Sequence, residues 1–303
     1  MSINGTLVAP EDARVSVFDR GFLYGDSVYE VVRTYKGVPF ELEKHLARLE
    51  SSAARIHMAL PASLDEIRAD IAAAHVASGN DDSYVRVVVT RGAGPIGLDP
   101  AMAIDPLRIV VARELSPPPP EAYADGVKIA LVSVRRNLRS AIDPAAKTGN
   151  YLNSVMALAE ARERGAHEAV MLDHRDYVTE GASSNVFAVM ERAVLTPPLD
   201  AGILEGVTRG VVFEVARRAG LRVIELPLTE AALEHADEVF ITSSIREIVP
   251  VVRVDDRVVG SGRPGPVYKR IRQLFDEYVE QYVLTHRPRA RSASSAGAPD
   301  RTS

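Results

Sequence analysis

Lys147-Thr148-Gly149-Asn150-Tyr151-Leu152-Asn153 and Glu180-Gly181-Ala182-Ser183-Ser184-Asn185-Val186-Phe187 are the two segments that decide the fold of this chain. The residues between them have room for one helix and two strands. Strands are predicted over 168–172 and 177–179, joined by a turn at 174–176, and a third strand over 186–190. The pattern predicts one wall of a cofactor pocket. A helix is predicted over 152–164, with a buried stripe formed by Leu152, Val155, Met156, Leu158 and Ala159.

Lys147 is the first candidate for chemistry, because an amine is a nucleophile only when it is uncharged. A free lysine has a pKa of about 10.4, and burial or a nearby cation lowers that value in lysines that form Schiff bases. The turn residues Asp143-Pro144 and Thr148-Gly149 around Lys147 predict a loop or strand end that points into a cleft. Most lysines are solvated, but Tyr151 four residues later and Glu180 at a strand end favour a shared pocket. A buried Glu180 would need a cationic partner.

Three further segments carry groups that bind phosphate. Arg48 lies in a predicted helix, and its planar guanidinium matches a phosphate dianion. A second helix opens at Gly206-Val207, where free backbone N–H groups and the Thr208 hydroxyl form an anion site. The third segment ends a strand with the hydroxyls and backbone donors of Ser243-Ser244. Solvated arginines, glycine-containing helix starts and serine-rich turns are each common, so the prediction of a phosphate site depends on the three segments together.

These residues together resemble the class IV (fold type IV) pyridoxal-phosphate aminotransferases, most closely the branched-chain members, over most of residues 17–282. The resemblance implies that Lys147 carries pyridoxal 5'-phosphate as an internal aldimine, that Tyr151 hydrogen-bonds the ring oxygen, and that Glu180 pairs with the pyridine nitrogen. An anion beside that nitrogen keeps the ring protonated and electron-withdrawing. The freed lysine amine moves a proton between a carbon of the substrate and a carbon of the cofactor. By the same resemblance the phosphate contacts are Arg48, Gly206, Val207, Thr208, Ser243 and Ser244.

Substrate contacts are expected mainly from the first half of the chain. Tyr24 and Tyr29 match pocket-lining positions of the family, although Tyr29 fits a core aromatic equally well. Tyr84 and Arg86 lie two residues apart on a predicted strand and therefore point the same way. The resemblance implies that Arg86 helps to hold the side-chain carboxylate of glutamate. It also implies that Ile245 contributes its backbone amide.

The resemblance predicts transamination between a branched-chain L-amino acid and 2-oxoglutarate, by a homodimer. Tyr29-Glu30-Val31 stands where branched-chain enzymes commonly have Phe-Glu-Gly, which favours a D-amino acid or (R)-amine transaminase, or an aminodeoxychorismate lyase. The arginine-x-histidine pair of D-specific enzymes is absent from residues 93–98. Stereochemical preference therefore stays open. A non-catalytic pyridoxal-phosphate carrier is disfavoured by the intact Lys147, Tyr151 and Glu180. Arg135 and Arg136 resemble a segment of archaeal branched-chain members, but loop arginines are usually solvated, and solvation is the expectation for both.

Composition and charge argue against several other classes of protein, namely nucleic-acid-binding, membrane-spanning, thiol-dependent and metal-dependent proteins. The chain has 303 residues and a formal net charge of −5, with both signs interspersed, so no basic nucleic-acid surface is expected. Tail arginines at 287, 289 and 291 are a weak exception. No run of about eighteen apolar residues predicts a membrane span, and no signal peptide is recognisable, so a cytoplasmic location is expected. Cysteine is absent, which removes thiolate chemistry, and the seven histidines are scattered, so no metal site is predicted.

The predicted fold is mixed α/β in two domains. Residues 1–116 form a small N-terminal α/β domain, with strands near 28–35, 38–41, 83–90 and 107–113 and helices near 43–57 and 64–78. The capping box Ser63-Leu64-Asp65-Glu66 opens the second of these helices. Residues 117–126 form an interdomain loop, which the run Pro117–Pro120 should make stiff and extended, and which the resemblance places beside the active site. Residues 127–286 form a larger pseudobarrel domain that binds pyridoxal phosphate, with helices near 152–164, 206–219 and 265–283. Residues 287–303 are predicted to be a disordered tail.

Overall fold

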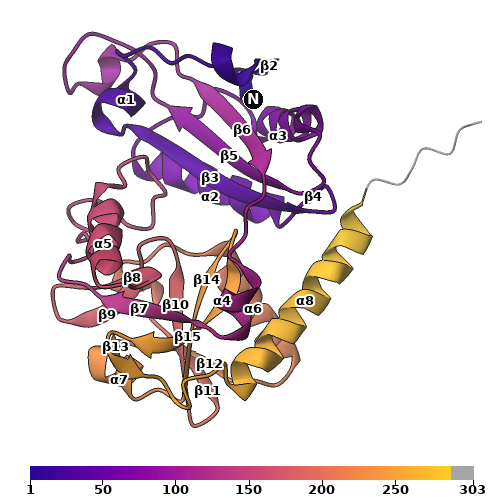
Figure 1. Cartoon of the computed structure of the whole chain (residues 1–303). Helices are drawn as coiled ribbons and strands as arrows, with labels where there is room; N and C mark the ends of the chain where they lie inside the picture. Colours follow the sequence, from indigo (N-terminus) through magenta and orange to yellow (C-terminus); the bar gives the residue numbers. More distant parts are fainter. Residues whose placement is uncertain (288–303) are drawn as a thin grey trace, which may run out of the picture.

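Two β-sheets, one from each half of the chain, lie one above the other in the computed structural model, which describes residues 1–287 (Figure 1). From residue 288 onward, the predicted disordered tail lies outside the described residues. The mixed α/β class is confirmed, while the division at residues 117–126 stays a prediction. No helix within residues 1–287 combines the length and apolar character needed to cross a bilayer.

The N-terminal sheet has six strands in the order β2-β1-β6-β5-β3-β4, all antiparallel. Side chains alternate along β5, so Val85, Val87 and Val89 are buried under two helices, and the residues between them lie on the opposite face of the sheet. The predicted strands are present, but the β1–β2 hairpin was missed because two-residue strands show no pattern. The strands are β1 (Ser2–Ile3), β2 (Thr6–Leu7), β3 (Ser27–Tyr35), β4 (Val38–Pro39), β5 (Ser83–Thr90) and β6 (Arg108–Glu114).

Two predicted helices cover one face of this sheet. Helix α2 (Leu42–Arg55) packs on β3, and α3 (Leu64–Ser78) packs on β6. The predicted capping box of α3 is confirmed, since the Ser63 hydroxyl accepts from the Glu66 amide while the Glu66 carboxylate accepts from the Ser63 amide. The other face of the sheet is therefore left for the second half of the chain.

The second sheet is mixed and has ten strands, in the order β12-β11-β10-β14-β15-β7-β8-β9-β13, with β16 on β15. It curls around an apolar interior that includes Ile129, Val186, Ile241 and Val249, as the pseudobarrel prediction requires. The strands are β7 (Val127–Leu131), β8 (Glu168–Leu172), β9 (Tyr177–Gly181), β10 (Asn185–Met190), β11 (Ala193–Thr196), β12 (Val223–Glu225), β13 (Leu228–Thr229), β14 (Glu238–Ser243), β15 (Glu247–Val254) and β16 (Arg257–Val258).

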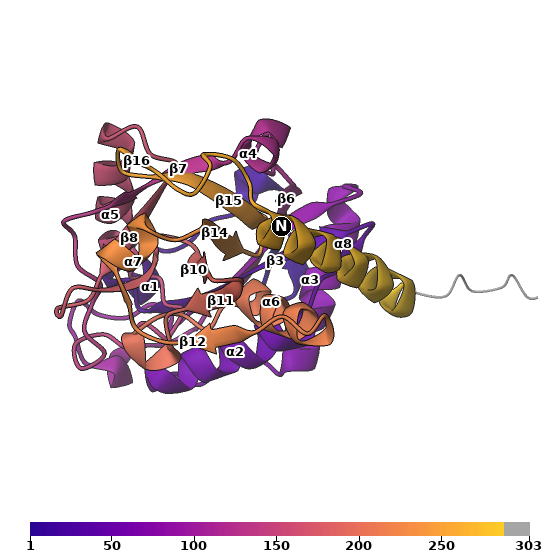
Figure 2. The same cartoon turned by 90° about the horizontal axis from the view of Figure 1, so that it is seen from below.

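Helices cover the outside of this sheet on two sides, as Figure 2 shows. Helices α6 (Val207–Arg218) and α8 (Pro266–His286) pack on Phe187 and Phe240, whose stacked rings lie 4.9 Å apart. Helix α5 (Leu152–Glu163) packs on β7 and β8. These three helices match the predicted ranges within a few residues. The short helices are α1 (Arg20–Tyr24), α4 (Pro120–Ala124) and α7 (Glu230–Glu234), with 3₁₀ turns at Pro10–Asp12, Pro100–Met102 and Leu199–Ala201.

The predicted buried stripe of α5 is wrong. The side of the helix that faces the sheet carries Ser154, Ala157 and Ala161, whose small side chains let the helix approach β7 and β8 closely. Leu152 and Met156 remain 64% and 54% exposed. Periodicity identified an apolar face correctly, but no other part of residues 1–287 covers that face.

The interdomain segment is only partly extended. Pro119 has the dihedral angles of an extended chain (φ −64°, ψ 153°), but Pro120 begins helix α4, because proline fits the first position of a helix. Helix α4 packs on β15. None of residues 117–126 lines the main cavity, and the Tyr123 hydroxyl reaches its wall by donating to the Arg246 carbonyl at 3.3 Å.

Candidate active site

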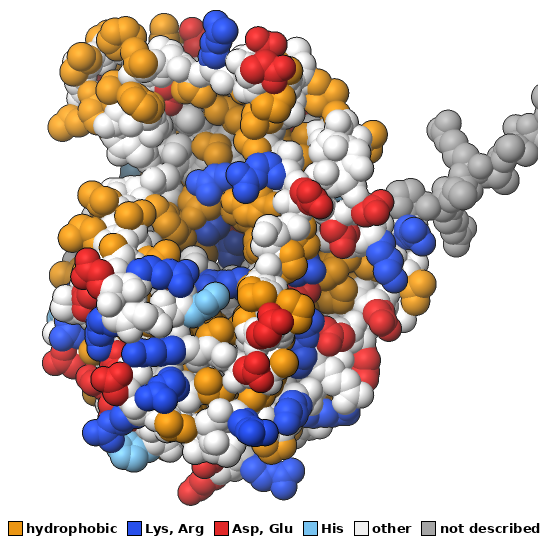
Figure 3. All heavy atoms as spheres, in the orientation of Figure 1, with side chains coloured by type: hydrophobic (Ala, Val, Ile, Leu, Met, Phe, Trp, Pro, Cys, Tyr) orange, Lys and Arg blue, Asp and Glu red, His pale blue; other side chains and the backbone are white. Residues whose placement is uncertain are grey.

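A cavity of about 460 Å³ lies between the two sheets. Figure 3 shows the molecule hollowed between its upper and lower parts, with Lys and Arg side chains in the hollow. The predicted site residues that line this cavity are Lys147, Arg48, Tyr151, Glu180, Gly206, Val207, Thr208, Ser243, Ser244, Tyr29, Tyr84, Arg86 and Ile245. Tyr24 does not line it.

Lys147 lies in the loop between β7 and α5, and this loop is fixed to the N-terminal half of the chain. The Lys147 amide donates to the Ser52 hydroxyl at 3.0 Å, and its carbonyl accepts from the Tyr29 amide at 3.0 Å. The Lys147 Nζ atom lies 3.3 Å from the Tyr29 hydroxyl and 3.4 Å from the Tyr151 hydroxyl. Burial raises the pKa of Tyr29 well above its usual value, so this phenol stays neutral. Tyr151 is the N-cap of α5, so its contact with Lys147 does not come from a helical turn.

Glu180, near the end of β9, is a buried carboxylate in the cavity wall. Its Oε1 atom pairs with Arg136 Nη2 at 2.7 Å, and its Oε2 atom accepts from the Leu204 amide at 2.9 Å. Burial raises the pKa of Glu180, while Arg136 and then the Leu204 amide act in the opposite direction. Arg136 was expected to be solvated, but its side chain is only 14% exposed and lines the cavity. The cationic partner that a buried Glu180 needs is therefore Arg136.

Arg48 projects from α2 and is oriented by a carboxylate that the sequence interpretation missed. Its Nε and Nη2 atoms bind the two oxygens of Glu30 at 2.7 and 2.8 Å, and its Nη1 donates to the Glu205 carbonyl at 2.7 Å. His45 Nδ1 lies 2.7 Å from the same carboxylate. Burial alone would raise the pKa of Glu30, but Arg48 and then His45 hold it well below the usual range. The bidentate pair fixes the guanidinium at the cavity edge.

The donor groups beside Arg48 in the cavity wall fit a phosphate. Gly206 is the N-cap of α6 and makes no side-chain capping bond, so the first amides of this twelve-residue helix lie at the cavity wall. A Cβ on Gly206 would come within 1.9 Å of Asn185 Oδ1, so a larger residue would displace the Asn185 side chain from its contact with the Leu204 carbonyl. Thr242 Oγ1, which was not predicted, is buried without a hydrogen-bond partner among residues 1–287. Helix amides, Arg48 and hydroxyls together form a donor set suited to a phosphate dianion.

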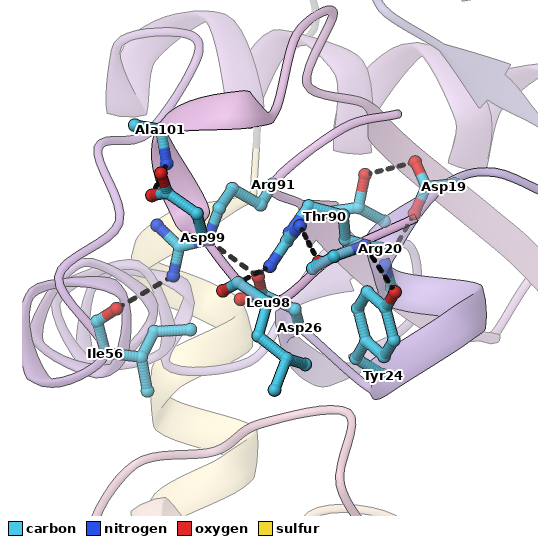
Figure 4. A network of polar contacts seen from close by, with 12 residues as sticks. Asp19, Arg20, Tyr24, Asp26, Ile56, Thr90, Arg91, Leu98, Asp99 and Ala101 are labelled. Carbon is cyan, nitrogen blue, oxygen red and sulfur yellow. Dashed lines mark hydrogen bonds and ion pairs between the residues drawn. The ribbon is translucent and has the colours of Figure 1, made fainter. Parts of the chain in front are cut away.

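Tyr24 is the one predicted substrate residue that does not line this cavity, and its substrate role stays a prediction. It ends the short helix α1, where Gly25 adopts a left-handed conformation (φ 69°), and its hydroxyl accepts from the Gly97 amide at 3.1 Å. Arg20 stacks on the Tyr24 ring and donates to the Gly97 and Leu98 carbonyls at 2.8 and 3.1 Å (Figure 4). Tyr24 therefore holds the loop around Gly97 in place and does not line the cavity.

A lysine amine, a buried carboxylate and a donor set suited to phosphate in one cavity are the combination that a pyridoxal-phosphate enzyme requires. Residues 27–254 match the family model for amino-transferase class IV, and the chain belongs to this family. The predicted family is thereby confirmed, and the protein is an aminotransferase that acts on amino acids.

Individual relatives show the same family at full length. A putative branched-chain-amino-acid aminotransferase of Methanocaldococcus jannaschii is 41% identical over 91% of this chain and 94% of its own. A D-alanine aminotransferase of Bacillus licheniformis is 36% identical over 91% of this chain and 95% of its own. The crystal structure of the T.th. branched-chain amino acid aminotransferase with pyridoxamine 5'-phosphate superposes with a TM-score of 0.87, at 33% identity, covering 91% of this chain and 92% of that chain.

Proposed function

We propose that this aminotransferase uses pyridoxal 5'-phosphate to move an amino group from a branched-chain L-amino acid to 2-oxoglutarate, in the cytoplasm. The observation that supports this proposal best is that Lys147, Glu180 and the phosphate-type site of Arg48 and α6 line one cavity. The solved relative that carries pyridoxamine 5'-phosphate supports the same cofactor.

Each residue then has a defined task. When bound, pyridoxal phosphate supplies a protonated ring that withdraws electrons from the substrate α-carbon. Lys147 holds the cofactor aldehyde covalently, and its Nζ atom, once released by substrate, carries the proton from the α-carbon. Glu180 accepts the hydrogen bond of the ring nitrogen. Arg48, with the first amides of α6, binds the phosphate.

The substrate end of the cavity combines one cation with apolar walls. Arg86 lies 3.9 Å from the centre of the Tyr29 ring and makes no hydrogen bond or ion pair within the described part of the chain. This free guanidinium suits the distal carboxylate of 2-oxoglutarate or glutamate. Tyr84 and Val31 line the same space and suit an aliphatic side chain.

Arg86→Ala is expected to lower kcat/KM for 2-oxoglutarate about 10- to 100-fold, because a charge-assisted hydrogen bond contributes about 1.5–3 kcal/mol. The rate of the first half-reaction, in which L-leucine donates its amino group, should change much less, since leucine has no second carboxylate. Stopped-flow half-reactions with each substrate measure the two effects separately. The control is Arg113→Ala, which removes an exposed arginine near Tyr84 that does not line the cavity. Equal losses for leucine and 2-oxoglutarate would contradict the assignment of Arg86.

A D-amino acid donor is the second candidate, and two observations favour it. Val31 lines the cavity where branched-chain members commonly have glycine, and one relative at 36% identity is a D-alanine aminotransferase. The deciding experiment compares L-leucine, L-valine, L-glutamate, D-alanine, D-glutamate and (R)-1-phenylethylamine, each followed by bleaching of the cofactor absorbance. Faster bleaching by the D-amino acids or by the amine would replace the branched-chain L-donor in this proposal.

A homodimer completes the proposal, and an exposed apolar surface supports it. Phe22 on α1, Leu98 in the loop after β5 and Leu152 on α5 are 70%, 80% and 64% exposed. Gly25 at the end of α1 approaches the backbone of Asn150 before α5, and Figure 3 shows hydrophobic side chains gathered on this side. Contiguous apolar patches of this kind are covered by a partner, and a second copy of the chain is the partner proposed.

The double variant Leu152→Glu with Met156→Glu is expected to convert the protein from twice its chain mass of 32.8 kDa to a monomer. Charges placed in an apolar interface are desolvated without partners, which opposes association. Sedimentation velocity measures the mass. Val76→Glu on α3 replaces another exposed apolar residue (78% exposed) and should remain dimeric. A wild-type protein that sediments at 32.8 kDa would remove the dimer from the proposal.

A further inference from the structure

The hairpin between β14 and β15 contributes its tip to the cavity wall and has an unusual residue at its end. Ser243 and Glu247 face each other across the ladder, and Ser244, Ile245 and Arg246 form the three-residue loop between them. The residue that closes such a loop adopts a left-handed conformation and is usually glycine. Here it is Glu247, with φ of 57°. A non-glycine residue at this position needs other contacts to hold it.

Those contacts come from both ends of the chain. Glu247 is 6% exposed, and its Oε1 atom accepts from the Tyr35 hydroxyl at 2.6 Å and pairs with Arg33 Nη1 at 2.9 Å. Its Oε2 atom pairs with Arg272 Nη2 of α8 at 2.8 Å. Arg33 and Tyr35 belong to β3 of the N-terminal sheet. One buried carboxylate therefore ties the hairpin to the opposite sheet and to the last helix.

The tip itself is held by the same neighbours. Arg33 Nη1 also donates to the Ile245 carbonyl at 3.1 Å. The Tyr123 hydroxyl of α4 donates to the Arg246 carbonyl at 3.3 Å, and Arg272 lies over the Tyr123 ring at 5.2 Å. Two successive peptide groups are thus fixed from outside the cavity. Their orientation sets how Ser244 and Ile245 face the cavity.

We propose that Glu247 is a positioning residue for the aminotransferase reaction: its carboxylate, held by β3 and α8, sets the hairpin tip in the geometry that binds the anionic groups of cofactor and substrate. This inference rests on the proposed function and on the contacts that the family resemblance implies for Ser244 and Ile245, both of which line the cavity. A displacement of about 1 Å in such a contact costs roughly 100-fold in rate, so a residue outside the cavity can act strongly through the tip.

Glu247→Gly separates the two roles of this position, because glycine accepts the left-handed backbone but removes the carboxylate. We expect the Kd for pyridoxal phosphate and the KM for the amino donor to rise roughly 10- to 100-fold each, with a smaller change in kcat. Glu247→Gln, which keeps one oxygen for Tyr35 and Arg33, should recover part of both affinities. Fluorescence titration of the cofactor-free protein measures the Kd independently of turnover.

Asp255→Gly is the matched control, since Asp255 also has a left-handed backbone (φ 51°) and a carboxylate paired with an arginine, Arg164, but lies away from the cavity. It should change Tm without changing either affinity. Unchanged Kd and KM in Glu247→Gly would overturn the inference; if that variant does not fold, unchanged values in both Glu247→Gln and Glu247→Asp would do so. A wild-type protein that binds cofactor but transaminates no donor would contradict the proposed function and leave the Kd comparison valid.

Discussion

Lys147→Ala is expected to lower transamination by at least about 10⁴-fold, the largest effect of any single substitution in this protein. Lys147 is the one lysine among the residues that line the cavity, and the arginines there cannot deprotonate to replace it. The variant loses both the covalent attachment of the cofactor and the base that moves the α-proton. Steady-state turnover with L-leucine and 2-oxoglutarate gives the magnitude.

Borohydride reduction followed by peptide mapping tests the attachment separately from turnover. Wild-type protein should carry the reduced cofactor label on the peptide that contains Lys147, and Lys147→Ala should carry none. Lys44→Ala is the control, because Lys44 is 46% exposed and pairs with Glu41 away from the cavity. It should keep both the label and the activity. A label on any other lysine of the wild-type protein would disprove the assigned role of Lys147.

Glu180→Gln is expected to slow the single-turnover reaction with L-leucine by roughly 10²- to 10⁴-fold. A neutral amide cannot hold the ring nitrogen of the cofactor in its protonated form, whereas a carboxylate paired with Arg136 can. Burial raises the pKa of Glu180, and the Arg136 guanidinium opposes that rise, so Arg136 helps to keep the group ionised. Stopped-flow absorbance of the cofactor-loaded variant measures the rate.

The substitution also leaves Arg136 without its buried anion, which destabilises the fold, so rate and stability must be measured together. Glu238→Gln provides the comparison: Glu238 is a second buried carboxylate, 7% exposed, which accepts from the amides of Val267 and Tyr268 far from the cavity. It should lower Tm without slowing the chemical step. An unchanged single-turnover rate in Glu180→Gln would exclude Glu180 as the partner of the ring nitrogen.

Local sequence was sufficient to predict an element and its orientation where the segment itself carries a hydrophobic alternation or a capping motif. The alternation of β5 placed Tyr84 and Arg86 on one face, and the capping box at Ser63 placed the start of α3. Contacts between segments far apart in the chain leave no pattern within either segment, so they were not predicted from local sequence. Arg136 was expected to be solvated because nothing near it in the chain indicates that Glu180 is its partner.

Other errors have equally physical causes. The α5 pattern gave an apolar face, but periodicity cannot tell a face buried within the chain from one left for a partner. Tyr24 matched a family position, but in this structure its hydroxyl accepts from the Gly97 amide, a contact between distant segments that local sequence does not signal. The Lys147–Tyr151 contact was anticipated from helical spacing, although the residues between them form a loop.

The cavity is lined by two sheets, one from each half of the chain, and this arrangement would allow substrate preference and cofactor chemistry to diverge independently. Tyr29, Tyr84 and Arg86 come from the first sheet, whereas Lys147 and Glu180 come from the second half of the chain. A chimaera that exchanges the first 116 residues between relatives would transplant most of the specificity surface in one piece. Arg48, the proposed phosphate-binding residue, would travel with it, since Arg48 and its orienting Glu30 both lie within these first 116 residues.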